Sequence, residues 1–280
     1  MNEKRGCNLK QILWNNVSMT TSPNLNPDST FNNDFEATFK TADSDAARPQ
    51  IVIATAMPME AAPFLEVLAA QEGFKQTTQA GLDVAVGTIA GKRVVVVTTG
   101  IGLVNAAYAA TVMCSRYQPK FYLCAGTTGG LAASTRVRDV CAGTDYTYSR
   151  ADATMFDYEP GQVPGMPATY PAGQTLLAAA HSLEVPGLTF GQVASSDAFI
   201  TTETVENMRT TFPRAIGADM ESTAAAQVCA KTGVEFLSLR GISDLCGPQA
   251  GDDFHVDGSE AAQVSANAVQ ALLSALPCGY

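Results

Sequence analysis

The feature that most constrains this chain is the alternation, from Pro49 onward, of short apolar runs with helical segments. We expect strands over residues 51–57, 82–90, 92–100, 120–130, 139–148, 188–200, 215–222 and 234–244. We expect helices after the first strand and over residues 103–117, 175–183, 204–212, 223–233 and 259–276. Nearly continuous apolar strands are typical of sheets covered on both faces. The pattern therefore predicts an α/β fold with a mixed, largely parallel sheet between helices.

The chain divides into two regions of different composition. Residues 1–49 are rich in Asn, Ser, Thr and Asp, and we expect a disordered N-terminal extension, because such a segment cannot bury enough apolar surface to offset the entropy of ordering. Residues 50–280 contain no internal repeat and no linker that would divide them. We therefore expect a single domain over residues 50–280.

Composition excludes several classes of function. A net charge of −10 argues against nucleic-acid binding, which needs a basic surface. No apolar run approaches the roughly 18 residues of a membrane helix, and the N-terminus lacks the apolar core of a secretory signal. Seven cysteines without a CxxC pair and only two histidines predict no metal site, and cysteines within apolar runs are typical of a reducing compartment. We expect a cytoplasmic protein without a cofactor.

Three acidic residues lie where predicted strands end or helices begin, namely Glu60, Glu221 and Asp244. Capping of a helix is the structural alternative for each of them. However, Arg240 and Ser243 lie beside Asp244 at the end of one apolar strand, and α/β sheets bind ligands outside strand ends. The three acids therefore suggest acid and base chemistry on an uncharged organic substrate.

Two further motifs leave alternatives open. The glycine-rich turns TTGIGLVNAA and AGTTGGLA each follow a strand, and their N–H groups could bind an anion or a sugar hydroxyl. Close packing explains either turn equally well, and Asn105 stands where a dinucleotide fingerprint would have glycine. The Phe199-Ile200 pair beside Ser196-Asp197 could sandwich an aromatic ring, with a core phenylalanine and an Asp turn as the alternative.

These motifs together resemble those of the 5′-methylthioadenosine/S-adenosylhomocysteine nucleosidases, within the nucleoside phosphorylase superfamily. The matching segments, spread over about residues 50–275, are AMPMEAAPF, TTGIGLVNAA, AGTTGGLA, ADATMFDYEPGQVPGMPA, SSDAFI, ADMESTAAAQVC and LRGISD. The resemblance implies a three-layer α/β/α sandwich with a mixed central sheet, nucleoside phosphorylase-like, and a homodimer. It also implies hydrolysis of the bond between adenine N9 and ribose C1′ of both nucleosides, in methionine salvage and recycling.

The resemblance assigns a role to each matching residue. Glu60 would activate the attacking water, and Asp244, oriented by Ser243, would donate a proton to adenine N7. Glu221 would bind the ribose hydroxyls. At the ribose, the implied contacts are Met220, Thr127 and Gly129, with Arg240 orienting the Glu221 carboxylate. At the base, Phe199 would stack on adenine and the Ile200 backbone would bind its Watson–Crick edge. The 5′-alkylthio group would be enclosed by Met57, Ile101 and Phe254, with Phe156 and Pro164 from the partner subunit. The family's TGSAGG turn is AGTTGG here, so Thr127 and Thr128 replace smaller residues.

Two rival functions share this fold. A nucleoside phosphorylase uses phosphate as its nucleophile and would need an arginine in the first strand-to-helix loop and another near the glycine-rich turns. The loop AMPME and the turn TTGIGLV contain no basic residue, so water is the expected nucleophile. A non-catalytic adenine-nucleoside binding protein is the second rival, and the presence of all three acids argues against it.

Overall fold

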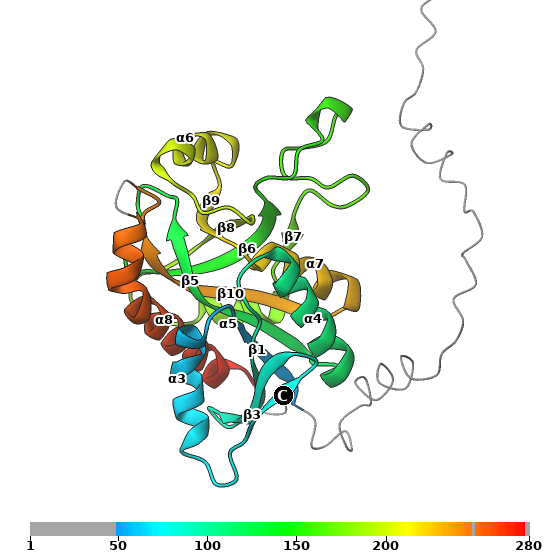
Figure 1. Ribbon diagram of the computed structural model, residues 1–280, viewed down its shortest axis with the longest axis vertical. Helices are drawn as coiled ribbons and strands as arrows, with labels where there is room; N and C mark the ends of the chain where they lie inside the picture. The colour runs from blue at the N-terminus through cyan, green and yellow to red at the C-terminus, as the bar shows by residue number, and fades with distance from the viewer. Residues whose placement is uncertain (1–48, 248–249, 278–280) are drawn as a thin grey trace, which may run out of the picture.

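The computed structural model describes residues 49–247 and 250–277, with the side chains of 250–257 excepted (Figure 1). The predicted N-terminal extension therefore lies outside the described residues, apart from Pro49. Within the described part of the chain, no helix combines the length and the hydropathy needed to cross a membrane.

The strands form one ten-stranded mixed sheet. Their bounds are β1 Ile51–Thr55, β2 Gln76–Gln79, β3 Leu82–Ile89, β4 Lys92–Thr98, β5 Phe121–Gly130, β6 Val140–Tyr148, β7 Tyr170–Pro171, β8 Leu188–Ser195, β9 Ala215–Asp219 and β10 Glu235–Asp244. The order across the sheet is β10-β6-β8-β9-β5-β1-β4-β3-β2, with β7 beside β6. Strands β4, β1, β5 and β10 are parallel to one another, so their carboxyl ends meet at one edge.

Strand β5 has three neighbours, because the sheet partly closes on itself. Its first residues, Phe121 to Cys124, pair with β1, while most of its length pairs with β10. At its end, Gly129 and Gly130 pair with β9 instead. Because β10 also pairs with β6, the strands β10, β6, β8, β9 and β5 form a closed ring. The strand pattern of the sequence does not indicate this closure.

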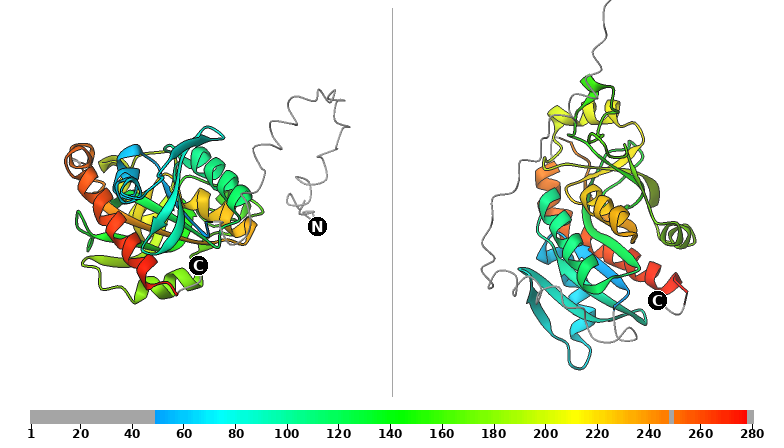
Figure 2. Two further views of the ribbon diagram at one scale, coloured as in Figure 1. Left: turned by 90° about the horizontal axis from the view of Figure 1, so that it is seen from below. Right: turned by 90° about the vertical axis from the view of Figure 1, so that its right-hand side faces the viewer.

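Helices cover the sheet on both sides and complete three layers, as the sequence predicts (Figures 1 and 2). Their bounds are α3 Pro58–Ala69, α4 Leu103–Tyr117, α5 Gln174–His181, α6 Thr202–Thr211, α7 Ser222–Thr232 and α8 Ala250–Ala275, with a 3₁₀ turn, η2, at Thr154–Phe156. Helices α3 and α8 pack against each other on one face, and α4 and α7 pack against each other on the opposite face. The core between the layers is formed by apolar residues of the central strands β1, β3, β4, β5 and β10 together with the buried faces of α3, α4 and α8.

Local signals set several of these bounds. Helix α7 ends at Gly233, whose φ of +74° and N–H bond to the Cys229 carbonyl form a left-handed cap, at the residue where the predicted helix ends. Helix α4 has the predicted bounds. The run expected as a strand over 188–200 ends at Ser195, because residues 196–200 turn across a cavity instead of continuing the ladder. The short strands β2 and β7, absent from the prediction, carry no apolar run that would indicate them.

Candidate active site

One cavity lies where the carboxyl ends of β1, β5 and β10 meet the ends of β8 and β9. The three acids predicted from the sequence, Glu60, Glu221 and Asp244, all line it. The predicted contacts that also line it are Met57, Ile101, Thr127, Gly129, Phe199, Ile200, Met220, Arg240 and Ser243. The chain thus brings together residues that lie as far as 187 positions apart in the sequence, from Met57 to Asp244.

Three predicted contacts are not placed at this cavity. Phe156 and Pro164 lie in the segment between β6 and β7, which projects from the body of the molecule (Figure 1), and neither lines the cavity of its own chain. Phe254 belongs to the part of α8 whose side chains lie outside the described residues.

Glu60 stands in the first turn of α3 and is buried. Its side chain folds back toward the helix start, where Oε2 accepts the N–H groups of Ala56 at 2.8 Å and Met57 at 3.1 Å. Its Oε1 accepts the N–H and the hydroxyl of Thr127 at 2.7 and 2.8 Å. Four donors converge on one carboxylate and fix its orientation. Glu60 does cap α3, but the bonds from Thr127 also fix it in the cavity.

A left-handed residue in β5 makes room for this carboxylate. Gly126 has a φ of +128°, and a Cβ there would lie 2.4 Å from the Glu60 carboxyl carbon. Its N–H donates to the hydroxyl of Ser265 in α8 at 2.9 Å, and that hydroxyl donates to the Leu239 carbonyl at 2.6 Å. Only glycine satisfies both the backbone angle and the close approach. Ser265, which no sequence motif indicates, therefore holds the strand segment that presents Thr127 to Glu60.

Glu221 is the N-cap residue of α7, but its side chain does not cap that helix. Its Oε1 instead accepts the N–H of Gly102 at 2.8 Å, and its Oε2 lies 3.1 Å from Nη2 of Arg240. Asp219 performs the capping role, since its Oδ1 accepts the N–H groups of Glu221 and Ser222. The capping alternative for Glu221 is therefore wrong, and its carboxylate is available to the cavity.

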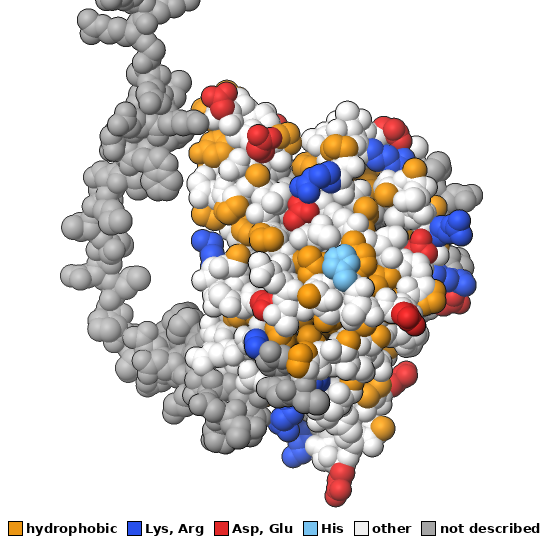
Figure 3. Space-filling view, turned by 180° about the vertical axis from the view of Figure 1, so that it is seen from behind, with side chains coloured by type: hydrophobic (Ala, Val, Ile, Leu, Met, Phe, Trp, Pro, Cys, Tyr) orange, Lys and Arg blue, Asp and Glu red, His pale blue; other side chains and the backbone are white. Residues whose placement is uncertain are grey.

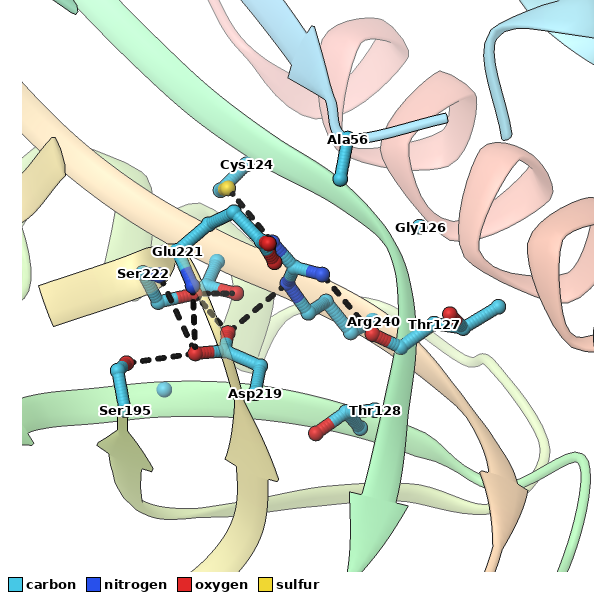
Figure 4. Close-up of polar contacts among 12 residues, drawn as sticks. Ala56, Cys124, Gly126, Thr127, Thr128, Ser195, Asp219, Glu221, Ser222 and Arg240 are labelled. Atoms are coloured by element: carbon cyan, nitrogen blue, oxygen red, sulfur yellow. Dashed lines mark hydrogen bonds and ion pairs between the residues drawn. The ribbon is translucent and has the colours of Figure 1, made fainter. Parts of the chain in front are cut away.

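Arg240 is buried and lies between two carboxylates, as Figure 4 shows. Its Nε is 3.0 Å from Asp219 Oδ2, and its Nη2 contacts Glu221. Its Nη1 donates to the Thr127 carbonyl at 2.9 Å, and Nη2 also lies 3.0 Å from the Cys124 sulfur. One guanidinium therefore connects Glu221 with the strand segment that holds Glu60.

Asp219 was not among the predicted site residues, although it lines the cavity. Its Oδ1 accepts the hydroxyl of Ser195 at 2.5 Å, and its Oδ2 accepts the hydroxyl of Ser222. It also pairs with Arg240. Its signal in the sequence was the ADMES segment, where a second acid precedes Glu221 by two residues at the end of a strand.

Burial dominates the titration of Glu221. Loss of water raises its pKa from the ordinary 4.5 to about 7, although Arg240 acts in the opposite direction. The nearby carboxylates of Asp219 and Glu60 raise the pKa further, while the Gly102 N–H lowers it. Glu221 therefore changes charge near neutral pH.

Asp244 lies at the end of β10 and is buried beside Ser243. Its Oδ2 accepts the Ser243 hydroxyl at 3.0 Å, and its Oδ1 accepts the N–H of Cys246 at 2.9 Å. Cys246 adopts a left-handed φ of +54°, and it lines the same cavity. No helix of the described residues begins at Asp244, so the capping alternative does not apply to it.

The glycine-rich turn before α4 binds carboxylates of this same chain. The N–H of Gly102 donates to Glu221, and the N–H of Leu103 donates to Asp197 Oδ1 at 2.7 Å. The positive end of a helix dipole favours anions at this position. The N–H groups of the turn therefore do bind anions, but these anions are the Glu221 and Asp197 carboxylates of the same chain. Among the described residues, no group of three or more His, Cys, Asp or Glu side chains could hold a metal ion.

Phe199 and Ile200 differ in their surroundings. Phe199 is half-exposed and lines the cavity, so the core alternative does not hold for it. Ile200 is buried in a small apolar cluster beneath α6. The pair therefore forms a wall of the cavity that is anchored on one side only.

Comparisons with known proteins agree with this arrangement. The sequence profile of the Phosphorylase superfamily matches residues 50–276. A 5′-methylthioadenosine/S-adenosylhomocysteine nucleosidase from Geobacillus kaustophilus is 35% identical over 210 residues, which cover 73% of this chain and 89% of that protein.

Two solved structures share the fold. A nucleosidase of the same name from Colwellia psychrerythraea, in complex with adenine, superposes with a TM-score of 0.78 at 32% identity, covering 82% of this chain and 96% of that one. The corresponding enzyme from Neisseria meningitidis, in complex with methylthio-immucillin-A, has a TM-score of 0.76 at 30% identity, with coverages of 81% and 99%.

Proposed function

This chain belongs to the 5′-methylthioadenosine/S-adenosylhomocysteine nucleosidases of the phosphorylase superfamily, and we propose that Glu60 and Asp244 are the groups with which it hydrolyses its substrates. The enzyme cleaves the N-glycosidic bond of both nucleosides, releasing adenine and a 5-thioribose. This reaction is consistent with a role in methionine salvage. The observation that carries the proposal is the convergence of both carboxyl groups, with Glu221 and Arg240, on one cavity.

Asp244 assists the departure of adenine. Glycosidic cleavage passes through an oxocarbenium-like centre, and adenine leaves readily only when it is protonated as it departs. Asp244 is held by the Ser243 hydroxyl and the Cys246 N–H, which keep its carboxyl group at the cavity wall. It donates its proton to N7 of a base that stacks on the half-exposed ring of Phe199 and meets the Ile200 backbone at its edge.

Glu60 activates the attacking water. Three of the four donors on its carboxylate are backbone N–H groups with fixed directions, and the fourth is the Thr127 hydroxyl. The hydroxyl alone can rotate away, which frees a lone pair of Oε1 for a water molecule. Glu60 then accepts a proton from this water as its oxygen bonds to C1′, while the C1′–N9 bonding electrons move to adenine.

The ribose is bound between these two groups. Glu221 accepts hydrogen bonds from the ribose hydroxyls in its ionised form, and Arg240 orients its carboxylate. Met220 and Thr127 contact the sugar, with Gly129 allowing its close approach. Met57 and Ile101 contact the 5′-alkylthio group, and Phe254 is proposed to complete that contact.

Several features favour water over phosphate as the nucleophile. Arg240 is the one basic side chain among the described residues that line the cavity, and it is already engaged by Asp219, Glu221 and the Thr127 carbonyl. The two N–H groups that begin α4 are bound to carboxylates as well. A phosphate dianion would have to displace these internal partners in a cavity that is also lined by Glu60 and Asp244, which is electrostatically unfavourable.

The enzyme acts as a homodimer, with Phe156 and Pro164 of one subunit covering the 5′ end of the partner's cavity. Exposed apolar side chains support this proposal. Val104 and Tyr108 are exposed on α4, and Met155 is 83% exposed in the projecting segment between β6 and β7. Figure 3 shows hydrophobic side chains in patches on the lobe formed by that segment, and a second copy of the chain would cover them.

The cytoplasm is the proposed location. The cysteines that the structure describes are all free thiols within the fold, which suits a reducing compartment.

Release of adenine is the direct test of the function. The purified chain, dialysed free of phosphate, is incubated separately with methylthioadenosine, S-adenosylhomocysteine and adenosine, and adenine is separated by chromatography. We expect adenine from the first two without added phosphate. Binding of these nucleosides without turnover would instead favour the non-catalytic binding protein, and turnover only with phosphate would favour a phosphorylase.

A further inference from the structure

Asp197 lies next to the cavity without lining it, yet it joins two of the segments that form the cavity wall. One segment is the turn 100–103, which carries Ile101. The other is 196–200, which carries Phe199 and Ile200. Nothing in the proposed chemistry uses Asp197, so its contacts need a separate explanation.

The contact between Asp197 and the turn is close. The Leu103 N–H donates to Asp197 Oδ1 at 2.7 Å. A Cβ at Gly102 would lie 2.9 Å from the same oxygen, and Gly102 has a φ of +106° that disfavours any other residue. The carboxylate is therefore packed directly against the turn, at the positive end of the α4 dipole.

In the 100–103 turn, the other anchors are the Asn105 side-chain amide, which donates to the Ile101 carbonyl at 2.7 Å, and the Gly102 N–H bound by Glu221. Ile101 and Phe199 are each 50% exposed, so packing alone does not hold them. The 196–200 segment is tied at its start, where the Ser196 N–H donates to the Asp219 carbonyl at 3.1 Å, and at its end, where Ile200 is buried. Between these two ends, Asp197 links the segment to the turn that carries Ile101.

The turn also connects to the ribose end of the site. Gly102 donates its N–H to Glu221 at 2.8 Å, immediately before the N–H that Asp197 binds. A shift of the turn would therefore move the partner of Glu221 together with Ile101. Two carboxylates, one on each of two adjacent N–H groups, fix the turn from both sides.

We propose that Asp197 is a positioning residue for nucleoside binding, which holds Phe199, Ile101 and the Gly102 N–H at the separation that the nucleoside requires. The assignment of these groups to base, 5′ end and ribose rests on the proposed function. Because the carboxylate of Asp197 binds the turn before α4 and does not line the cavity, it acts on binding and not on the bond-breaking step.

The test compares Asp197→Ala and Asp197→Asn with Glu235→Ala and Glu235→Gln. Glu235 is a matched control, since its carboxylate caps α5 through the Thr175 N–H at 2.8 Å and lies outside the cavity. We expect Asp197→Ala to raise KM for methylthioadenosine and the Kd for adenine roughly five- to tenfold, with kcat within about threefold, as expected for loss of one helix-cap bond. Asp197→Asn keeps an oxygen acceptor for Leu103 and should recover most of the affinity.

Each readout separates the possible outcomes. Adenine binding by calorimetry does not depend on turnover, so it tests Asp197 even if the wild-type chain fails to cleave the nucleoside. Unchanged KM and Kd in Asp197→Ala would overturn the proposal, as would a loss confined to kcat. A rise in KM of the same size in Glu235→Ala would show a general effect of helix capping and would also overturn it.

Discussion

Glu221 makes the stability of the ligand-free protein depend on pH in a way that a single substitution can isolate. Burial raises the pKa of this carboxyl group from the ordinary 4.5 to about 7. A raised pKa in the folded state means that the folded protein binds the proton more tightly than the unfolded chain does. The resulting stabilisation is fully present below the unfolded value of 4.5, and it is lost as the pH rises through about 7.

The size of the effect follows from the two pKa values. Between pH 5 and pH 8 the stabilisation from this one group decreases by about 2–3 kcal/mol, since each pKa unit corresponds to roughly 1.4 kcal/mol. Glu221→Gln removes the titration and keeps an oxygen that can accept the Gly102 N–H. The free energy of unfolding of the wild type, minus that of the variant, should therefore fall by about 2–3 kcal/mol from pH 5 to pH 8.

Urea unfolding at pH 5, 6, 7 and 8 measures this difference directly. Thr128→Val serves as the control, because it removes a buried hydroxyl that donates to the Ala218 carbonyl in the same cavity without removing a titrating group. Its difference from the wild type should stay constant with pH. If the Glu221→Gln difference were equally constant, the titration of a buried Glu221 near neutrality would be refuted.

Three substitutions test the assigned chemistry. Asp244→Asn should lower kcat by about 10²–10⁴ with a small change in nucleoside binding, because an amide cannot supply the proton; unimpaired turnover would remove Asp244 from its role. Glu60→Gln should cause a similar loss of kcat, measured by adenine release under saturating substrate, and normal hydrolysis by this variant would contradict a general base at Glu60. Gly126→Ala should destabilise the fold by about 2–4 kcal/mol and also reduce kcat, because its Cβ collides with the Glu60 carboxylate. Gly73→Ala, with a φ of +75° but open space around it, should show the backbone strain alone and leave kcat unchanged.

Much of the fold can be predicted from the sequence, because buried strands and helices give local patterns of apolar residues. Strand β1 is apolar along nearly its whole length, β5 begins with an apolar run, β10 carries apolar residues over its first half, and Gly233 marks the end of α7. The closure of the sheet is a different matter. It depends on the change in the pairing of β5, which lies beside β1 at its start and beside β9 from Gly129 onward. Local sequence does not indicate which strand a residue pairs with.

In the candidate site too, some residues could be predicted from local sequence, whereas others depend on tertiary contacts. The acids Glu60, Glu221 and Asp244 were found because each stands at a strand end or a helix start, where ligands bind. The resemblance also implied Arg240 beside Glu221 and Ser243 beside Asp244, but it did not indicate the roles of Asp219 and of the Gly102 N–H. That Asp219 takes over the cap of α7 and leaves Glu221 free for Gly102 and Arg240 depends on contacts between β9, α4 and β10. Local signals for Asp219 and Glu221 as caps are equivalent, and only the tertiary structure distinguishes them.

The identity of the sugar product reveals which nucleophile reaches C1′. Methylthioadenosine is incubated with the wild-type enzyme in excess inorganic phosphate, and the sugar is identified by mass spectrometry. With Glu60 activating water and Arg240 engaged by internal carboxylates, we expect 5-methylthioribose alone, at the rate measured without phosphate. Formation of 5-methylthioribose 1-phosphate would contradict this expectation.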